Sequence, residues 1–202
     1  MKKLIDILYN NINTIQVIGS TDIAVHALQL DSRKVEKNDL FFAIKGVSVD
    51  GHAFISKVIE QGASVIVCEE IPTEKNENVT YIQVDDARKT SALIACNFYD
   101  DPSQKLKLVG VTGTNGKTTV ATLLYELYKK QGEKVGLLST IENKINNEII
   151  PSTHTTPNPI ELNALLKKMV DANCDYVFME VSSHAIDQDR ITGLKFAGAA
   201  FT

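Results

Sequence analysis

The chain has 202 residues, enough for one large domain or two small ones. Hydrophobic residues make up 44% of it and charged residues 23%, which is typical of a globular protein with a real core. The net charge of -4 argues against a nucleic-acid-binding protein, and no window reaches the roughly 18 apolar residues that a membrane span needs. Because Asp6 interrupts the first apolar stretch too early for a secretory signal, we expect a soluble, cytoplasmic protein.

The first part of the chain alternates short apolar runs with one helical pattern. Strands are predicted at residues 39–44, 64–68 and 81–84. Residues 52–61 place their apolar side chains on one helical face, and Gly62 is expected to end that helix. The polar stretch 71–78 contains a proline and predicts a surface loop.

A second alternation begins near Asp86. Strands are predicted at 106–111, 134–140, 176–181 and 199–202, and helices at 87–99, 118–131 and 159–172. Strands that alternate with crossover helices imply a mostly parallel sheet. We therefore predict an α/β protein with a small first domain, residues 1–86, and a second domain, residues 87–202.

Three cysteines, Cys68, Cys96 and Cys174, are widely spaced among apolar neighbours. They form no C-x-x-C pair and have no zinc-site spacing. The pattern predicts buried, reduced thiols.

The segment 113–119 reads Gly-Thr-Asn-Gly-Lys-Thr-Thr and lies between a predicted strand and a predicted helix. Backbone N–H groups and the positive end of a helix bind phosphates, and glycine lets the backbone approach them. Gly113 and Gly116 supply that loop, Lys117 is expected to reach the β- and γ-phosphates, and Thr118 to bind Mg²⁺. The segment therefore predicts a nucleoside triphosphate site.

The loop by itself allows several other interpretations. The strict P-loop pattern has glycine where this chain has Val111, and the simplest alternative is a glycine turn between strand and helix. A GTPase would need Asn-Lys-x-Asp, whereas residues 143–146 read Asn-Lys-Ile-Asn. On the loop alone, a simple phosphoryl-transfer kinase stays open.

A second apolar strand that ends in an acid is expected beside such a loop, to complete the metal site. Residues 176–180 fit, with Glu180 at the carboxyl end, where ligands of α/β proteins bind. The alternative is an ordinary capping glutamate. Ser182 and Ser183 follow without a Gly-x-Ser-x-Gly elbow, which argues against a hydrolase triad, and His184 equally suits a surface position.

The surroundings of the loop are more specific than the loop. Residues 110–119 resemble the ATP loop of the Mur ligases, which add amino acids to the peptidoglycan precursor, and Val111 is usual in that family. Further segments resemble the tripeptide-forming members of the family: 30–35, 39–43, 50–52, 155–157 and 179–185, followed by Gln188 and Arg190. The Glu-Val-Ser-Ser-His-Ala run argues against the member that adds D-alanyl-D-alanine. The resemblance extends over essentially the whole chain.

The resemblance implies a role for each matching position. The UDP end of the precursor would contact Leu30, Ser32, Val47, Ser48 and Val49. Its muramoyl-dipeptide portion would contact Thr155, Thr156, Ser182, Gln188 and Arg190. ATP would bind Gly113, Thr114, Asn115, Gly116, Lys117, Thr118 and Thr119, with magnesium on Thr118 and Glu180; Lys117 and Glu180 are the implied catalytic residues. The family often has asparagine where this chain has His154, so the role of His154 stays open.

The resemblance also implies the reaction: ATP-dependent amide formation that adds a diamino acid, meso-diaminopimelate or L-lysine, to UDP-N-acetylmuramoyl-L-alanyl-D-glutamate. The glutamyl γ-carboxylate would attack the γ-phosphate, and the amine would displace the resulting acyl phosphate. Because the two anions repel each other, Lys117, magnesium and Arg190 would screen and align them.

The family continues into a histidine-bearing loop, a carboxylated lysine and an amino-acid-binding domain, which these residues do not contain. We therefore expect an N-terminal fragment, a UDP-binding domain plus part of a P-loop ATPase domain, that does not ligate by itself. A non-catalytic module that captures UDP-sugar or ATP is the alternative. The full-length protein is expected to be a monomer.

Overall fold

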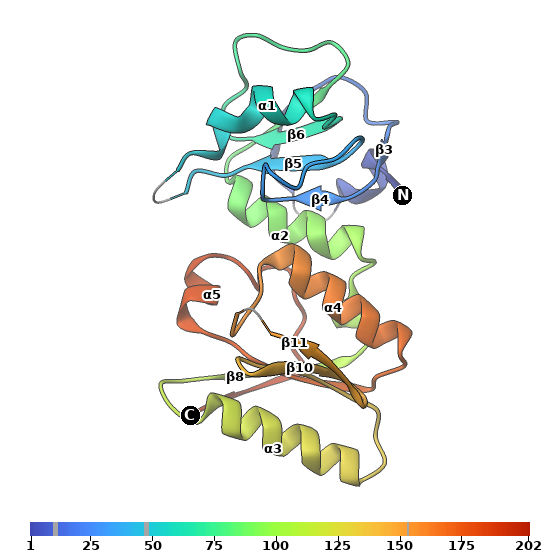
Figure 1. The fold of residues 1–202 in the computed structure, drawn as a ribbon, viewed down its shortest axis with the longest axis vertical. Coiled ribbons are helices and arrows are strands. Elements are labelled where there is room, and N and C mark those ends of the chain that lie inside the picture. Colours follow the sequence, from blue (N-terminus) through green and yellow to red (C-terminus); the bar gives the residue numbers. More distant parts are fainter. Residues whose placement is uncertain (10–11, 47–48, 153) are drawn as a thin grey trace. The chain divides into compact units, whose positions relative to one another are not determined.

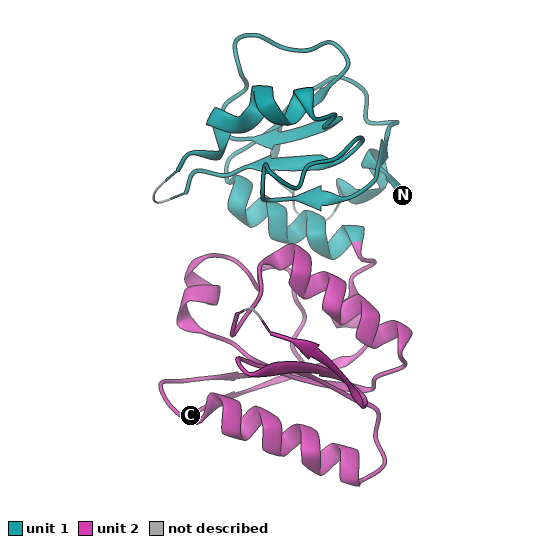
Figure 2. Cartoon of the chain, in the orientation of Figure 1, with its two compact units in different colours: residues 1–98 teal, residues 99–202 magenta. Residues whose placement is uncertain are grey.

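The computed structural model describes residues 1–9, 12–46, 49–152 and 154–202. They form two compact units, residues 1–98 and residues 99–202, each with its own larger sheet (Figures 1 and 2). Among these residues, no helix combines the length and the hydrophobicity that a membrane crossing requires.

The first unit is a sheet between helices, with α1 on one face and α2 on the other (Figure 1). The strand order is β2-β7-β6-β5-β4, in which β4 to β7 are parallel and the edge strand β2 is antiparallel. Every residue of β5 and β6 is buried, which explains why these strands are continuous apolar runs. The elements are β1 (Lys2–Lys3), η1 (Leu4–Ile7), β2 (Thr14–Ile18), β3 (Ala24–Val25), β4 (Leu28–Gln29), β5 (Leu40–Ala43), η2 (Gly51–Phe54), α1 (Ile55–Glu60), β6 (Val65–Cys68), β7 (Thr80–Val84) and α2 (Ala87–Phe98).

The segment predicted as one helix over 52–61 begins with a 3-10 turn, η2, and continues as α1. The Asp50 carboxylate accepts a hydrogen bond from the His52 N–H and caps this turn. Gly62 follows α1 with φ +106°, a left-handed conformation that favours glycine, so the predicted stop is confirmed.

The structure places the division between the units after Phe98 rather than near Asp86. Ala92 and Ile94 of α2 are buried, and this helix contacts β5 and η1 of the first unit. The side-chain amide of Asn97 also donates to the carbonyl oxygens of Ile7 and Tyr9, at 2.9 and 2.7 Å. Tertiary packing therefore decides which unit this helix joins, and the local pattern does not contain that information.

The second unit has the strand order β11-β10-β9-β12-β8-β13. Strands β9, β12, β8 and β13 are parallel, whereas β10 and β11 form an antiparallel hairpin, so the expected mostly parallel sheet is confirmed. Helices α3 and α4 cover opposite faces (Figure 1). The elements are η3 (Pro102–Gln104), β8 (Lys107–Thr112), α3 (Lys117–Lys130), β9 (Val135–Leu138), β10 (Glu142–Ile145), β11 (Glu148–Pro151), α4 (Pro159–Asp171), β12 (Tyr176–Glu180), α5 (Ser183–Asp187) and β13 (Gly198–Phe201).

Several hydrogen bonds hold the turn of the β10–β11 hairpin in place. Asn146 has φ +53°, a conformation that asparagine tolerates better than most residues. Its N–H donates to the Val135 carbonyl at 2.9 Å, and its side-chain amide donates to the Ala172 carbonyl at 3.2 Å. The Tyr125 hydroxyl of α3 donates to the Asn146 carbonyl. Elements distant in sequence thus meet at one residue.

The three cysteines are free and buried, as the sequence predicts. Burial raises the pKa of the Cys68 thiol to about 11, and it also raises the pKa of Cys174. These thiols therefore remain protonated at neutral pH.

Candidate functional site

The glycine-rich loop joins the carboxyl end of β8 to the first residue of α3. Gly113 has φ +135° and Gly116 has φ +81°, conformations that L side chains rarely adopt. A Cβ on Gly113 would also lie 1.8 Å from the carbonyl oxygen of Thr202, so the loop has no room for a side chain there. Both glycines are therefore required by backbone geometry.

Lys117 begins α3 and lies along the loop. Its ammonium group donates to the carbonyl oxygens of Gly113 and Thr114, at 2.9 and 3.3 Å. Thr114, Asn115 and the helical Thr119 are exposed. The predicted phosphate-binding group thus sits over the loop, at the N-terminus of a helix long enough to favour anions.

Glu180 ends β12 directly beside the loop, because β12 and β8 are parallel neighbours with Glu180 opposite Val111. Its side chain is buried, with 1% exposed. The Thr118 hydroxyl of α3 donates to the Glu180 Oε2 atom at 2.8 Å. The structure therefore brings together the two residues that the sequence assigned to one magnesium site.

Thr140 is a third member of this cluster that the sequence analysis missed. Its N–H donates to Glu180 Oε1 at 2.8 Å, and its hydroxyl donates to Oε2 at 3.2 Å. Thr140 follows β9, the other parallel neighbour of β12. A hydroxyl residue at the carboxyl end of the adjacent predicted strand was the signal that could have identified it.

The oxygen atoms of this cluster fit magnesium. A carboxylate and a hydroxyl are the hard ligands that Mg²⁺ prefers, and it usually completes its shell with phosphate oxygens and water. A site built only from protein side chains would need more acidic or imidazole groups, and the described ranges contain no cluster of three or more His, Cys, Asp or Glu residues that could hold a metal. The arrangement suits a metal carried with a nucleotide.

The residues predicted for the dipeptide portion form a hydrogen-bonded network with Glu180. The buried Thr156 hydroxyl donates to the Glu180 carbonyl at 3.0 Å and accepts from the Ser182 N–H at 3.2 Å. Arg190 donates through Nη1 to the Thr156 carbonyl at 2.7 Å, and through Nε and Nη2 to Gln188 Oε1 at 3.1 and 2.7 Å.

Thr155 joins the same network from the other side. Its hydroxyl oxygen lies 3.0 Å from the hydroxyl oxygen of Thr140, within hydrogen-bond distance. Both His154 and His184 are exposed. The five residues predicted to hold the dipeptide therefore lie around the candidate magnesium site, and the individual roles stay predictions.

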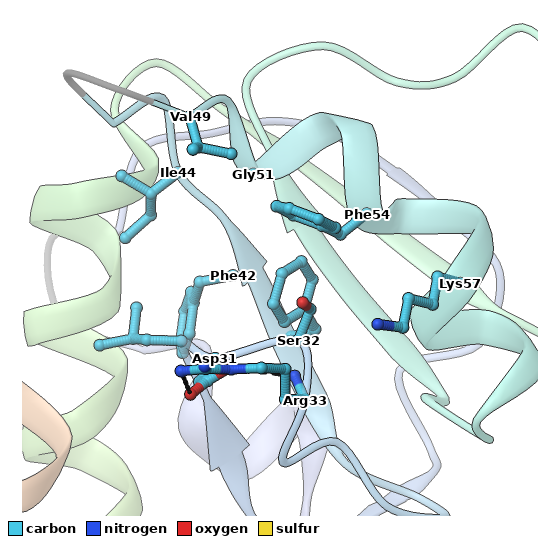
Figure 3. Close-up of a pocket in the computed structure, with 11 residues that line it drawn as sticks. Asp31, Ser32, Arg33, Phe42, Ile44, Val49, Gly51, Phe54 and Lys57 are labelled. Atoms are coloured by element: carbon cyan, nitrogen blue, oxygen red, sulfur yellow. Dashed lines mark hydrogen bonds and ion pairs between the residues drawn. The ribbon is translucent and has the colours of Figure 1, made fainter.

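The first unit contains a separate cavity of about 450 Å³ near the carboxyl ends of β4 and β5 (Figure 3). Leu30, Ser32 and Val49, three of the residues predicted for the UDP end, line it. Val47 and Ser48 lie outside the described residues. The complete lining is Leu30, Asp31, Ser32, Arg33, Phe41, Phe42, Ile44, Val49, Gly51, Phe54 and Lys57.

A buried carboxylate supports the segment that forms one wall of this cavity. Asp39 is 1% exposed, and its Oδ2 atom accepts from the Gln29 side chain at 3.1 Å and from the Glu36 N–H at 3.0 Å. These bonds hold both ends of the segment that carries Leu30 and Ser32. The sequence pattern identified Asp39 only as the start of a strand.

At the cavity mouth, Arg33 forms a two-point ion pair with Asp31, from Nε to Oδ1 at 2.9 Å and from Nη2 to Oδ2 at 2.8 Å. The guanidinium group holds the pKa of the Asp31 carboxyl well below its usual range. Asp31 is therefore anionic at neutral pH, and its charge is matched by Arg33.

Two family models match the chain. The Mur ligase family, catalytic domain, matches residues 24–99, and the Mur ligase middle domain matches residues 111–202. The chain belongs to the Mur ligase family. The resemblance seen in the motifs is thereby confirmed, and each model falls within one of the two units apart from residue 99.

Named relatives give a finer comparison. The chain is 56% identical over 198 residues to the UDP-N-acetylmuramoyl-L-alanyl-D-glutamate–2,6-diaminopimelate ligase of Cytophaga hutchinsonii, covering 98% of this chain and 40% of that protein. It is 54% identical to the ligase of the same name from Bacteroides fragilis, covering 99% of this chain and 41% of that protein. The chain thus spans about two fifths of the length of these relatives.

Solved structures agree on the fold. A ligase structure of the same name superimposes with a TM-score of 0.74 at 25% identity, covering 88% of this chain and 36% of that chain. The MurF ligase of Thermotoga maritima in complex with ADP gives a TM-score of 0.51 at 25% identity, covering 79% of this chain and 32% of that chain. The predicted α/β class is confirmed.

Proposed function

We propose that this chain supplies the precursor-binding and ATP-binding parts of a ligase that adds 2,6-diaminopimelate to UDP-N-acetylmuramoyl-L-alanyl-D-glutamate. The names of the relatives support this substrate set, and they favour diaminopimelate over the lysine that the sequence left open. A cytoplasmic reaction in peptidoglycan synthesis follows from the use of ATP and a UDP-linked precursor.

The observation that carries the proposal is the cluster around Glu180. A buried carboxylate accepts a hydrogen bond from a hydroxyl at the start of α3, beside a loop whose backbone requires glycine at two positions. This arrangement is suited to a triphosphate with its metal, because the helix terminus and Lys117 attract the phosphates while Thr118 and Glu180 present oxygen ligands. Bound Mg²⁺ supplies positive charge that offsets the repulsion between reacting anions. The ADP complex of the Thermotoga maritima ligase supports a nucleotide cofactor.

The chain's own residues then bind and orient the reactants. Lys117 holds the phosphate end of ATP, and Arg190, aligned by Gln188 and the Thr156 carbonyl, holds the carboxylate of the precursor. The carboxylate attacks the γ-phosphate and ADP leaves, giving an acyl phosphate; the amine of diaminopimelate then displaces phosphate and forms the amide. The UDP end is assigned to the cavity of the first unit.

Equilibrium binding by the 202-residue chain is the first test. Isothermal titration calorimetry with MgADP and with the UDP-linked dipeptide precursor should show one site for each. If the chain does not bind the precursor at millimolar concentration, the proposed substrate is wrong. If it does not bind MgADP, the proposed nucleotide site is wrong.

Catalysis needs a second test on protein that carries this sequence and the further length of its relatives. Phosphate release should require ATP, precursor and diaminopimelate together. The alternative, a non-catalytic module that captures UDP-sugar or ATP, predicts binding without diaminopimelate-dependent phosphate release.

A further inference from the structure

We propose that Lys57 is a specificity-determining residue for the diphosphate of the UDP end. This inference rests on the proposed function, since it takes the cavity of the first unit as the UDP site. It assigns a ligand-binding role to a residue of α1 that the family resemblance does not include.

The cavity has two chemically different sides (Figure 3). Its apolar side chains present flat or branched surfaces that suit a nucleobase, which favours stacking and shape complementarity. Its polar and charged groups suit the phosphate end. The apolar group is Leu30, Phe41, Phe42, Ile44, Val49 and Phe54, and the polar group is Asp31, Ser32, Arg33 and Lys57.

The charges on the polar side decide which residue attracts an anion. Asp31 and Arg33 form a tight two-point pair, so together they contribute no net charge. Because Arg33 keeps the pKa of Asp31 low, this balance holds across the neutral range. A doubly charged diphosphate would gain little charge attraction from a neutral pair, so a further cation would add to its binding.

Lys57 meets this requirement. It lines the cavity, and it has no ion pair or side-chain hydrogen bond with any other described residue. In Figure 3 its side chain extends from α1 with the ammonium group toward Ser32 and Arg33. Ile55 and Val58, the buried residues of α1, anchor the helix in the hydrophobic core of the first unit.

A lysine is chemically suited to the task. Its ammonium group is a compact point charge on a flexible stem, and it can follow a diphosphate without a fixed approach geometry. The Ser32 hydroxyl, on a residue that is 8% exposed and lines the same cavity, adds a hydrogen-bonding group. The geometry therefore gives the diphosphate one neutral pair, one hydroxyl and one unbalanced positive charge.

The test compares UDP with uridine, which lacks the phosphates, by calorimetry on the 202-residue chain. The Lys57→Ala variant should bind UDP about 3- to 10-fold more weakly, as expected for one cation at the rim of a site, with uridine affinity unchanged. The Lys57→Arg variant should retain most of the UDP affinity. The matched control is Lys75→Ala, an exposed lysine outside the cavity, which should change neither affinity.

Salt gives an independent readout. UDP binding by the unchanged chain should weaken as salt rises, and this dependence should be shallower in Lys57→Ala, because one charge contact is gone. Equal UDP affinity in Lys57→Ala and the unchanged chain would overturn the inference. An equal loss for UDP and uridine would also overturn it, since the role would then be packing. If the unchanged chain binds neither UDP nor uridine, the assignment of the cavity to UDP is wrong, and the role of Lys57 is wrong with it.

Discussion

The two units place their candidate sites at the same kind of position, the carboxyl ends of parallel strands, but they build them differently. In the second unit, Glu180 is surrounded by hydroxyl and N–H donors that are already hydrogen-bonded to it. In the first unit, the cavity walls are largely apolar, with charged groups on one side. The site proposed for ATP thus has its polar atoms arranged in advance, whereas the cavity proposed for the UDP end relies more on apolar surface and shape. Single substitutions should therefore have larger effects in the second unit.

The largest effect is expected from Lys117→Ala. Loss of a charged hydrogen-bond donor to phosphate should weaken MgADP binding roughly 100-fold, while UDP binding by the first unit stays the same. Calorimetry with both ligands measures this. Lys130→Ala, at the other end of α3, is the control. A change below threefold in Lys117→Ala would contradict the phosphate role.

Glu180→Gln should reduce nucleotide affinity about 10-fold or more in magnesium and much less in EDTA, because the amide removes the negative charge that the metal would contact. The nitrogen of the introduced amide would also face donors from Thr118 or Thr140, so some stability should be lost. Thermal melts with and without MgADP separate the two effects. Equal losses in magnesium and in EDTA would exclude a metal-specific role.

Thr156→Val should lower the free energy of unfolding by about 1–3 kcal/mol, because it leaves the Ser182 N–H and the Glu180 carbonyl without their buried partner. Urea denaturation followed by circular dichroism measures this loss. Thr119→Val, on the exposed face of α3, should stay within about 0.5 kcal/mol. Equal stability of the two variants would show that the network is not coupled to folding.

The smallest effect is expected from Ser32→Ala. One hydroxyl in a mostly apolar cavity should contribute about 3- to 5-fold to UDP affinity and nothing to MgADP affinity. Calorimetry of both ligands tests this, with Ser183→Ala, an exposed serine of α5, as the control for UDP. A 100-fold loss of UDP affinity in Ser32→Ala would contradict the expectation that single substitutions have smaller effects in the first unit.

The buried strands and long helices were predictable because their residues are uniformly apolar or follow a helical period. The β10–β11 hairpin was not, since the buried position 143 in β10 is an asparagine, whose side chain accepts from the Ser139 N–H at 3.3 Å. The alternation of buried and exposed residues is therefore hidden from a hydrophobic pattern. Strand β2 was missed for another reason: it is an edge strand that is exposed along most of its length.

Much of the candidate site was also predictable. The spacing from a glycine loop to a strand ending in an acid identifies Thr118 and Glu180, because parallel neighbours bring their carboxyl ends together. Thr140 and Asp39 were not identified, since their contacts depend on which strands are neighbours and on how loops fold back. The position of Lys57 at the cavity likewise depends on how η2 joins α1.

The turn at Asn146 has a consequence for the motions of the second unit. Its N–H bonds to Val135, its side chain to Ala172, and its carbonyl accepts from Tyr125, so three separate parts of the chain hold this residue in place. Hairpin tips ordinarily exchange their amide hydrogens by local fraying. Exchange at Asn146 should instead follow the cooperative opening of the whole second unit, which makes this amide a native reporter of that unit's stability.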